Sequence, residues 1–203
     1  IVGYIVNYYL SQHKKVAIVS RGYKRATKGT FIVSDGIRCF GSAAEAGDEP
    51  LLLARNHPGA TVVVDEQRVR GVRAALECSH ADVVILDDAF QHRAIARDLD
   101  LLVLDATVKL ATMRLLPAGL RREPFGAVKR AGLIAFSRAL PSPDLRAMVA
   151  SLSSAPVVSI RFAPAGLRGL GAPSVLPLPS LNGRRSLAFC GIGNPTAFRT
   201  TLE

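Results

Sequence analysis

The chain has 203 residues, of which 49% are hydrophobic and 21% are charged, a composition that excludes an intrinsically disordered protein. Its formal net charge of +10 favours anionic partners such as nucleic acid, anionic lipid or phosphorylated small molecules. Aromatic residues make up only 6% of the chain, and none alternates with basic residues as in a base-stacking surface. These features argue against a nucleic-acid-binding module, although the charge keeps that alternative open.

The three cysteines, Cys39, Cys78 and Cys190, are widely spaced and form no Cys-x-x-Cys or Cys/His pattern. This spacing predicts free thiols in a reducing cytosol. The apolar residues 1–10 are too few to span a bilayer and lack the features of a signal peptide. Because the chain starts with Ile and ends within a predicted helix, we expect it to be an internal fragment.

Helical and extended patterns alternate along the chain. In the first half we expect a helix over residues 1–12, a strand over 15–20, a hairpin over 31–40, a helix over 47–56, a strand over 61–64 and a helix over 65–79. In the second half we expect strands over 83–86, 101–104, 133–136, 157–160 and 186–190, a helix over 144–152 and a further helix that residues 191–195 open. This order predicts an α/β fold built on a parallel sheet.

The composition changes at residues 163–179, which contain four prolines and several glycines. Such a segment is typical of a linker or of an irregular crossing between domains. We therefore expect a core domain over residues 1–162, and over 163–203 a linker with the start of a second, smaller α/β domain.

The most informative stretch is the apolar run Val83–Leu86, which two acids, Asp87 and Asp88, follow directly. An unbroken apolar run is typical of a strand that is buried on both faces. In open α/β sheets ligands bind at the carboxyl ends of the strands, and an acid after such a strand is the Walker-B arrangement near Mg²⁺ and nucleotide phosphates. The alternative is an acidic strand-to-helix turn with Asp88 as the helix cap.

Three polar loops are expected to meet at the carboxyl edge of the sheet: Ser20–Arg25, Gly47–Pro50 and Asp87–Arg93. They supply a cationic loop, a single acid, and an acid pair with a histidine, a combination that suits phosphoryl transfer. The alternatives are a solvated basic turn, a helix cap at Asp48 and a packing or surface position for His92.

The chain contains no Gly-x-x-x-x-Gly-Lys-[Ser/Thr] phosphate loop. The predicted first helix and the strand after it are the elements that such a loop would precede. We therefore expect the phosphate loop to lie just upstream of Ile1.

Five ordered motifs resemble the tetraacyldisaccharide 4'-kinases, the lipid A 4'-kinases of Gram-negative bacteria. The motifs are residues 20–25 (SRGYKR), 47–50 (GDEP), 87–93 (DDAFQHR), 116–119 (LPAG) with 122–124 (REP), and 191–195 (GIGNP). Lys24 and Ala89 are similar to the Bacteroidetes branch of the family. Another P-loop ATPase or a small-molecule ligase is the enzyme alternative.

The resemblance implies a P-loop NTPase-like core that uses Mg²⁺ and ATP to phosphorylate the 4'-hydroxyl of a lipid A disaccharide 1-phosphate precursor. It places the enzyme at the cytoplasmic face of the bacterial inner membrane, against an anionic membrane surface, with no nucleic acid as a partner. Because the phosphate loop, the membrane helix and a histidine that the family pairs with its catalytic acid are not in the chain, we expect the fragment to be inactive.

The resemblance also implies roles for individual residues. Asp48 is expected to activate the sugar hydroxyl, and Asp87 and Asp88 to form the Walker-B pair near Mg²⁺. The full expectation is catalysis by Asp48, Asp88 and His92, substrate binding by Ser20, Arg21, Gly22, Tyr23, Arg25, Gln91 and Arg122, and metal binding by Asp87, Asp88 and Glu123.

Overall fold

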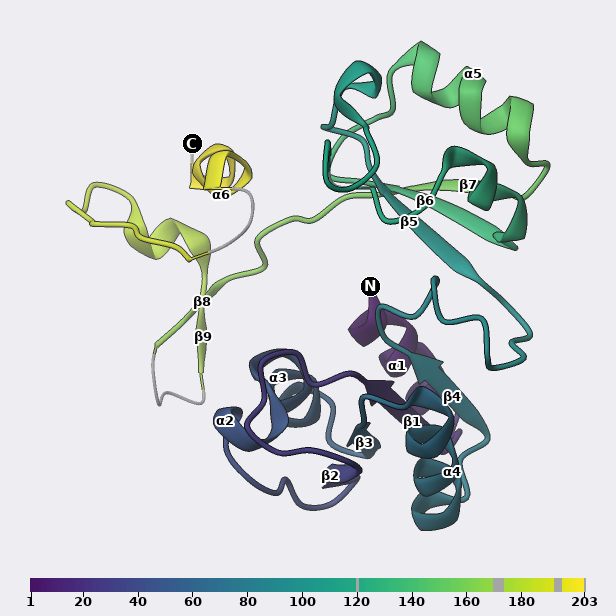
Figure 1. Ribbon diagram of the computed structural model, residues 1–203. Helices are drawn as coiled ribbons and strands as arrows, with labels where there is room; N and C mark the ends of the chain where they lie inside the picture. The colour runs from purple at the N-terminus through teal and green to yellow at the C-terminus, as the bar shows by residue number, and fades with distance from the viewer. Residues whose placement is uncertain (120, 170–173, 192–194, 203) are drawn as a thin grey trace. The chain divides into compact units, whose positions relative to one another are not determined.

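The computed structural model describes residues 1–119, 121–169, 174–191 and 195–202 (Figure 1). The chain divides into two compact units, Ile1–Asp98 and Leu99–Glu203. The boundary between these units, after Asp98, lies earlier in the chain than the domain boundary expected between residues 162 and 163. The expected domain boundary stays a prediction. The two units are described separately below.

The first unit is built on a four-stranded sheet with the strand order β2-β3-β1-β4. Strand β1 runs parallel to both β3 and β4, whereas β2 is antiparallel to β3. The elements are α1 (Val2–Ser11), β1 (Val16–Ser20), β2 (Phe31–Asp35), α2 (Ala43–Ala46), α3 (Asp48–Asn56), β3 (Ala60–Val64), α4 (Arg68–Ser79) and β4 (Val83–Leu86).

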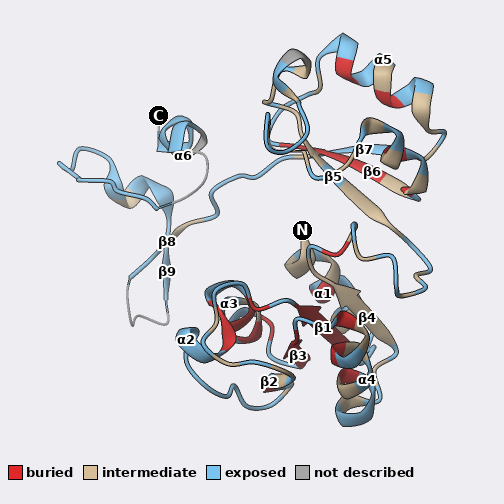
Figure 2. Cartoon of the chain, in the orientation of Figure 1, coloured by how far each residue is buried: buried red, intermediate tan, exposed pale blue. Residues whose placement is uncertain are grey.

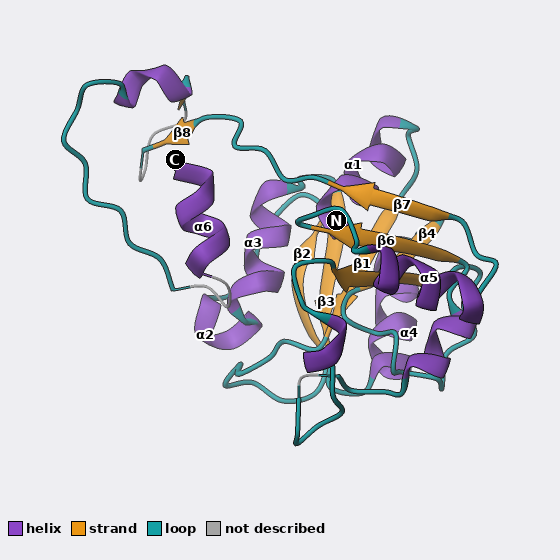
Figure 3. Cartoon of the chain, turned by 90° about the horizontal axis from the view of Figure 1, so that it is seen from above, coloured by secondary structure: helices purple, strands orange, loops and turns teal. Residues whose placement is uncertain are grey.

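Helices cover both faces of this sheet, with α3 and α4 on opposite sides (Figures 1 and 3). Side chains alternate across a strand, so Val16 and Ile18 of β1 join one core cluster with α1 and α3. Ala17 and Val19 join a second cluster with α4 on the other face. Strands β1 and β3 are consequently buried along their whole length (Figure 2), which explains why all their residues except Ser20 and Thr61 are apolar.

The second unit contains a three-stranded parallel sheet with the order β5-β6-β7, so β6 is its central strand. Ile134 and Phe136 of β6 are fully buried, as are Leu145 and Val149 of α5. The side chain of Ser142 caps α5 by accepting a hydrogen bond from the Leu145 N–H. The elements are β5 (Leu101–Asp105), η1 (Leu110–Thr112), η2 (Phe125–Arg130), β6 (Leu133–Ser137), α5 (Pro143–Leu152), β7 (Val157–Ile160), β8 (Leu167–Arg168), β9 (Val175–Leu176), η3 (Leu178–Leu181) and α6 (Pro195–Leu202).

Two strand predictions are wrong. Residues 186–190 are irregular, and Leu187 and Phe189 are almost fully exposed, because an apolar run forms a strand only where a partner strand and a core receive it. The second arm of the expected hairpin, residues 37–40, does turn back on β2, where the Phe40 N–H donates to the Val33 carbonyl over 2.8 Å, but it makes an isolated antiparallel bridge between Ser34 and Cys39 and no strand. The strand that pairs with β2 is the more distant β3.

The segment expected as a linker, residues 163–179, contains the short antiparallel pair of β8 and β9. Helix α6 begins at Pro195 as expected, while residues 192–194 of the motif before it lie outside the described residues. Helix α2 was not expected. It is set by a capping box in which Ser42 and Glu45 satisfy each other's backbone N–H groups.

We predict that Ile18→Ala lowers the free energy of unfolding by about 2–5 kcal/mol, because Ile18 is fully buried at the centre of β1. Ile37→Ala is the matched control, since that side chain is 90% exposed and its loss should change stability by less than about 0.5 kcal/mol. Urea unfolding of the two variants measures the difference, and equal midpoints would contradict the assignment of the core.

Candidate active site

The carboxyl ends of β3, β1 and β4 lie at one edge of the first sheet. The Asp65 N–H donates to the Ser20 carbonyl over 3.0 Å, and the Asp87 N–H donates to the Val19 carbonyl over 3.0 Å. The Ser20 hydroxyl donates to Asp87 Oδ2 over 3.2 Å. The parallel register therefore places Ser20, Asp65 and Asp87 side by side, as the strand pattern predicts.

A buried arginine that the sequence analysis missed ties these strand ends together. Arg68, the first residue of α4, is only 5% exposed. Its Nη1 donates to the Asp65 carbonyl over 2.9 Å and its Nη2 to the Asp87 carbonyl over 3.3 Å. One guanidinium thus spans from the end of β3 to the end of β4, which lie on either side of β1.

Burial lowers the pKa of Arg68, while the carboxylates of Asp87 and Asp88 act in the opposite direction and the cation of Arg21 lowers the pKa further. The charged groups of Asp87, Asp88 and Arg21 therefore lie near the Arg68 guanidinium. The sequence did contain a signal for this arginine. The first turn of α4 has no acid but has Arg68 and Arg70, and a cation at a helix N-terminus is unfavourable unless other groups hold it.

Asp87 carries a partly buried carboxylate beside a second acid. Burial raises its pKa and Asp88 raises it further, whereas the Ser20 hydroxyl and Arg68 oppose the shift. A divalent cation stabilises such a pair of carboxylates, so the residues fit Mg²⁺. In the part of the chain that the structure describes, no cluster of three or more His, Cys, Asp or Glu residues forms, whereas Mg²⁺ in kinases typically takes one or two carboxylates together with substrate phosphates.

The segment after Asp88 is a series of turns and not a helix. Asp88 is exposed and has a φ of 47°, so the expected alternative of Asp88 as a helix cap is wrong. Arg97 Nη1 donates to the carbonyls of Ala89 and His92, each over 2.8 Å, and these bonds hold the turns. The Nε2 atom of His92 is buried and finds no hydrogen-bond partner in the described residues.

Asp48 begins α3, and its carboxylate is exposed. The helix cap is Gly47, which has a φ of 91°, so the expected alternative of Asp48 as the cap is wrong. A Cβ atom on Gly47 would lie 3.3 Å from the Gly22 Cα atom. This close approach of two glycines brings the start of α3 against the basic loop.

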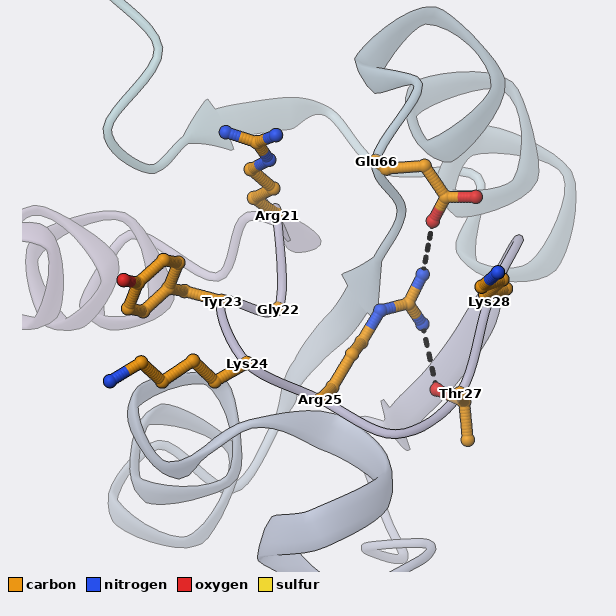
Figure 4. Close-up of a pocket in the computed structure, with 8 residues that line it drawn as sticks. All are labelled: Arg21, Gly22, Tyr23, Lys24, Arg25, Thr27, Lys28 and Glu66. Atoms are coloured by element: carbon orange, nitrogen blue, oxygen red, sulfur yellow. Dashed lines mark hydrogen bonds and ion pairs between the residues drawn. The ribbon is translucent and has the colours of Figure 1, made fainter.

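The basic loop after β1 lines a cavity of about 350 Å³ (Figure 4). Tyr23 is 73% exposed, and the Lys24 Nζ atom lies 5.4 Å from the centre of the Tyr23 ring. The loop touches the start of α3 through Gly22 and reaches Asp87 through Ser20, so the three expected loops do meet. The cavity is lined by Arg21, Gly22, Tyr23, Lys24, Arg25, Thr27, Lys28 and Glu66.

Comparison with known protein families identifies the family of this chain. Residues 1–203 match the family described as LpxK, tetraacyldisaccharide-1-P 4'-kinase. The chain belongs to the tetraacyldisaccharide 4'-kinase family. The expected resemblance is thereby confirmed, while the expected Bacteroidetes branch stays a prediction.

Relatives that carry the name tetraacyldisaccharide 4'-kinase agree with this family. The protein from Anaeromyxobacter dehalogenans is 44% identical over 195 residues, which cover 94% of this chain and 52% of the relative. The protein from Geobacter metallireducens is 40% identical over 206 residues, which cover 100% of this chain and 59% of the relative. The chain thus spans about half the length of the curated relatives that it matches.

A solved structure of the family has the same fold. The crystal structure of LpxK from Aquifex aeolicus in complex with ATP is similar with a TM-score of 0.75 and 34% identity, covering 99% of this chain and 61% of that chain. The expected fold class, an α/β P-loop NTPase-like protein, is therefore confirmed.

Two residues that the family resemblance assigns to the site, Arg122 and Glu123, belong to the second unit. Arg122 is exposed, and Glu123 forms an ion pair with Arg130 in which Nη1 and Oε2 are 2.9 Å apart. The hydrogen bond from Arg130 to Glu123 raises the pKa of Arg130. The expected metal-binding role of Glu123 stays a prediction.

We predict that Asp87→Asn stabilises the chain at pH 7 in the absence of nucleotide and Mg²⁺. Because burial raises the pKa of Asp87, the folded chain holds a proton over the range between the ordinary and the raised value, and stability is lost as the pH rises through that range. The charged carboxylate is therefore destabilising at neutral pH, and the neutral amide removes that cost.

Chemical denaturation from pH 3 to pH 8 checks this prediction. The stability gained by Asp87→Asn should shrink when the pH falls below about 3.9, the ordinary pKa of aspartate. Asp98→Asn, at an exposed acid, is the control and should change stability by less than about 0.5 kcal/mol. An Asp87→Asn variant that is less stable at pH 7 would refute the argument.

Proposed function

We propose that the protein containing this chain transfers the γ-phosphate of ATP to the 4'-hydroxyl of a lipid A disaccharide 1-phosphate precursor. The observation that carries the proposal is the meeting of three loops: Ser20 bonds to Asp87, and Gly22 packs against Gly47, which precedes Asp48. Phosphoryl transfer needs this combination of an acid near the metal, an acid near the acceptor hydroxyl and cations for the anionic substrate.

On the nucleotide side, Asp87 and Asp88 would hold the Mg²⁺ of Mg²⁺-ATP. When bound, the metal ion neutralises charge on the phosphates during transfer. The buried and unpartnered Nε2 of His92 would form a hydrogen bond to the nucleotide or to the acceptor. Glu123 would complete the metal side.

On the acceptor side, Asp48 would accept the proton of the sugar hydroxyl, because its exposed carboxylate is not used as a helix cap. Arg21 and Tyr23 in the cavity would bind the phosphate and the sugar rings, since a guanidinium suits phosphate and an aromatic face suits a sugar. Ser20, Gly22, Gln91 and Arg122 would complete the substrate contacts.

We further propose that the protein works at the cytoplasmic face of the inner membrane and has no nucleic acid as a partner. The acylated substrate resides in a membrane, and a net charge of +10 suits an anionic bilayer surface. Within the described ranges, no helix is both long and apolar enough to cross a bilayer.

In the full-length protein we predict that Asp48→Asn lowers kcat by at least about 100-fold while ATP binding is retained, because the variant lacks the base but not the nucleotide site. Glu49→Gln, at the adjacent exposed acid in the same helical turn, is the matched control and should retain activity. Turnover of the acylated disaccharide 1-phosphate and titration with ATP are the measurements. A loss of ATP binding in Asp48→Asn would assign Asp48 to the nucleotide side or to structure.

We also predict that Asp87→Ala raises the Mg²⁺ concentration required for half-maximal turnover by at least about tenfold, since a carboxylate of the metal site is removed. Titration of activity with Mg²⁺ at saturating ATP measures the shift. An unchanged Mg²⁺ requirement would exclude Asp87 from the metal site.

A further inference from the structure

Arg25 differs from the other cations of the basic loop because its guanidinium is already bound within the protein. Its side chain is only 3% exposed, and it forms an ion pair with Glu66 in which Nη2 and Oε2 are 2.6 Å apart. Nη1 donates to the Thr27 hydroxyl over 3.0 Å, and Nη2 also donates to the Gly29 carbonyl. In Figure 4 Glu66 and Thr27 lie on one side of the loop, while Tyr23 and Lys24 extend on the other.

Glu66 binds the loop at a second point. Its Oε1 and Oε2 atoms accept from the Gly29 N–H over 2.9 and 3.1 Å. Glu66 follows Asp65 at the end of β3, so this one carboxylate connects the sheet edge to both ends of the segment from Arg25 to Gly29. A charged group that satisfies several donors at once is well suited to fix a loop conformation.

The position of Arg25 also fixes the residues expected to meet the substrate. A Cβ atom on Gly22 would collide with Arg25 Cδ, so the arginine stem lies directly over the backbone between Arg21 and Tyr23. The Ala26 N–H donates to the Ala44 carbonyl over 2.6 Å, and the Thr27 hydroxyl donates to the Glu45 carbonyl over 2.6 Å. The loop is thereby anchored both to β3 and to α2.

We propose that Arg25 and Glu66 form a clasp that positions the basic loop, and that Arg25 is a positioning residue and not a substrate contact. The clasp holds Arg21 and Tyr23 where the sugar phosphate binds. Among the described residues, Arg21, Lys24 and Lys28 line the same cavity without an ion pair, so they provide the cations for the anionic substrate. This inference rests on the proposed function and reassigns Arg25 within it.

The two possible roles of Arg25 predict opposite effects of Glu66→Gln. If Arg25 bound the substrate phosphate, removing the charge of Glu66 would release the guanidinium, and substrate binding would stay the same or tighten. If the clasp positions the loop, the same change loosens the loop and weakens substrate binding.

The test measures Glu66→Gln in the full-length protein with the acylated disaccharide 1-phosphate in detergent micelles. We expect the KM for the disaccharide to rise about tenfold, the loss expected for one charged hydrogen-bonding pair, while kcat and the KM for ATP change less than about threefold. Arg25→Lys should have a similar effect, and the double variant should be little worse than either single one, because both changes weaken the same pair of Arg25 and Glu66. Glu77→Gln, at an exposed acid of α4, is the matched control.

Amide hydrogen exchange gives a readout that does not depend on catalysis. The Gly29 N–H should exchange faster in Glu66→Gln than in the unsubstituted protein, because the neutral amide oxygen of Gln is a weaker acceptor than the carboxylate. An unchanged Gly29 exchange rate, or an unchanged or lower KM for the disaccharide in an active protein, would overturn the inference. If the unsubstituted protein does not phosphorylate the disaccharide, the proposed function fails, and faster Gly29 exchange then still supports the clasp.

Discussion

The parallel pairing of β3, β1 and β4 is the constraint on which the candidate site depends. Because the three strands run in the same direction and in register, the residues that follow them, Asp65, Arg21 and Asp87, emerge at the same edge. The strand ends would leave backbone carbonyls without partners, and Arg68 supplies donors to two of them. One buried cation thus satisfies the backbone and compensates the nearby carboxylates at the same time.

The charges at this edge oppose the stability of the fold. Burial raises the pKa of Asp87 and lowers that of Arg68, so each ionised group is held in an environment that disfavours its charge. The cost is tolerated because the strands beneath are buried on both faces and contribute apolar packing along their whole length. Asp88 also adopts a φ of 47°, a conformation that costs energy in a residue other than glycine. Unfavourable local energies of this kind gather at sites that bind ligands.

The sequence predicts the carboxyl edge of the first sheet well where the prediction depends only on neighbouring residues. The apolar run Val83–Leu86 and the acids after it identify both the strand and the site, because burial and position follow from neighbouring residues. The strand expected over residues 186–190 fails because strand formation depends on a partner that the local pattern does not contain. Glu66 was missed for the same reason: its partner Arg25 is 41 residues away, and no periodicity connects them.

The basic loop shows why net charge is an incomplete guide to binding. A count of cations treats Arg21, Lys24, Arg25 and Lys28 alike, yet the guanidinium of Arg25 is already bound by Glu66, Thr27 and Gly29. A cation in such a pair contributes little net field to a ligand, because the carboxylate beside it cancels most of its charge. Anion binding in the cavity therefore depends on Arg21, Lys24 and Lys28, which are outside the ion pair of Arg25 and Glu66. Arg25 contributes by keeping these cations in place.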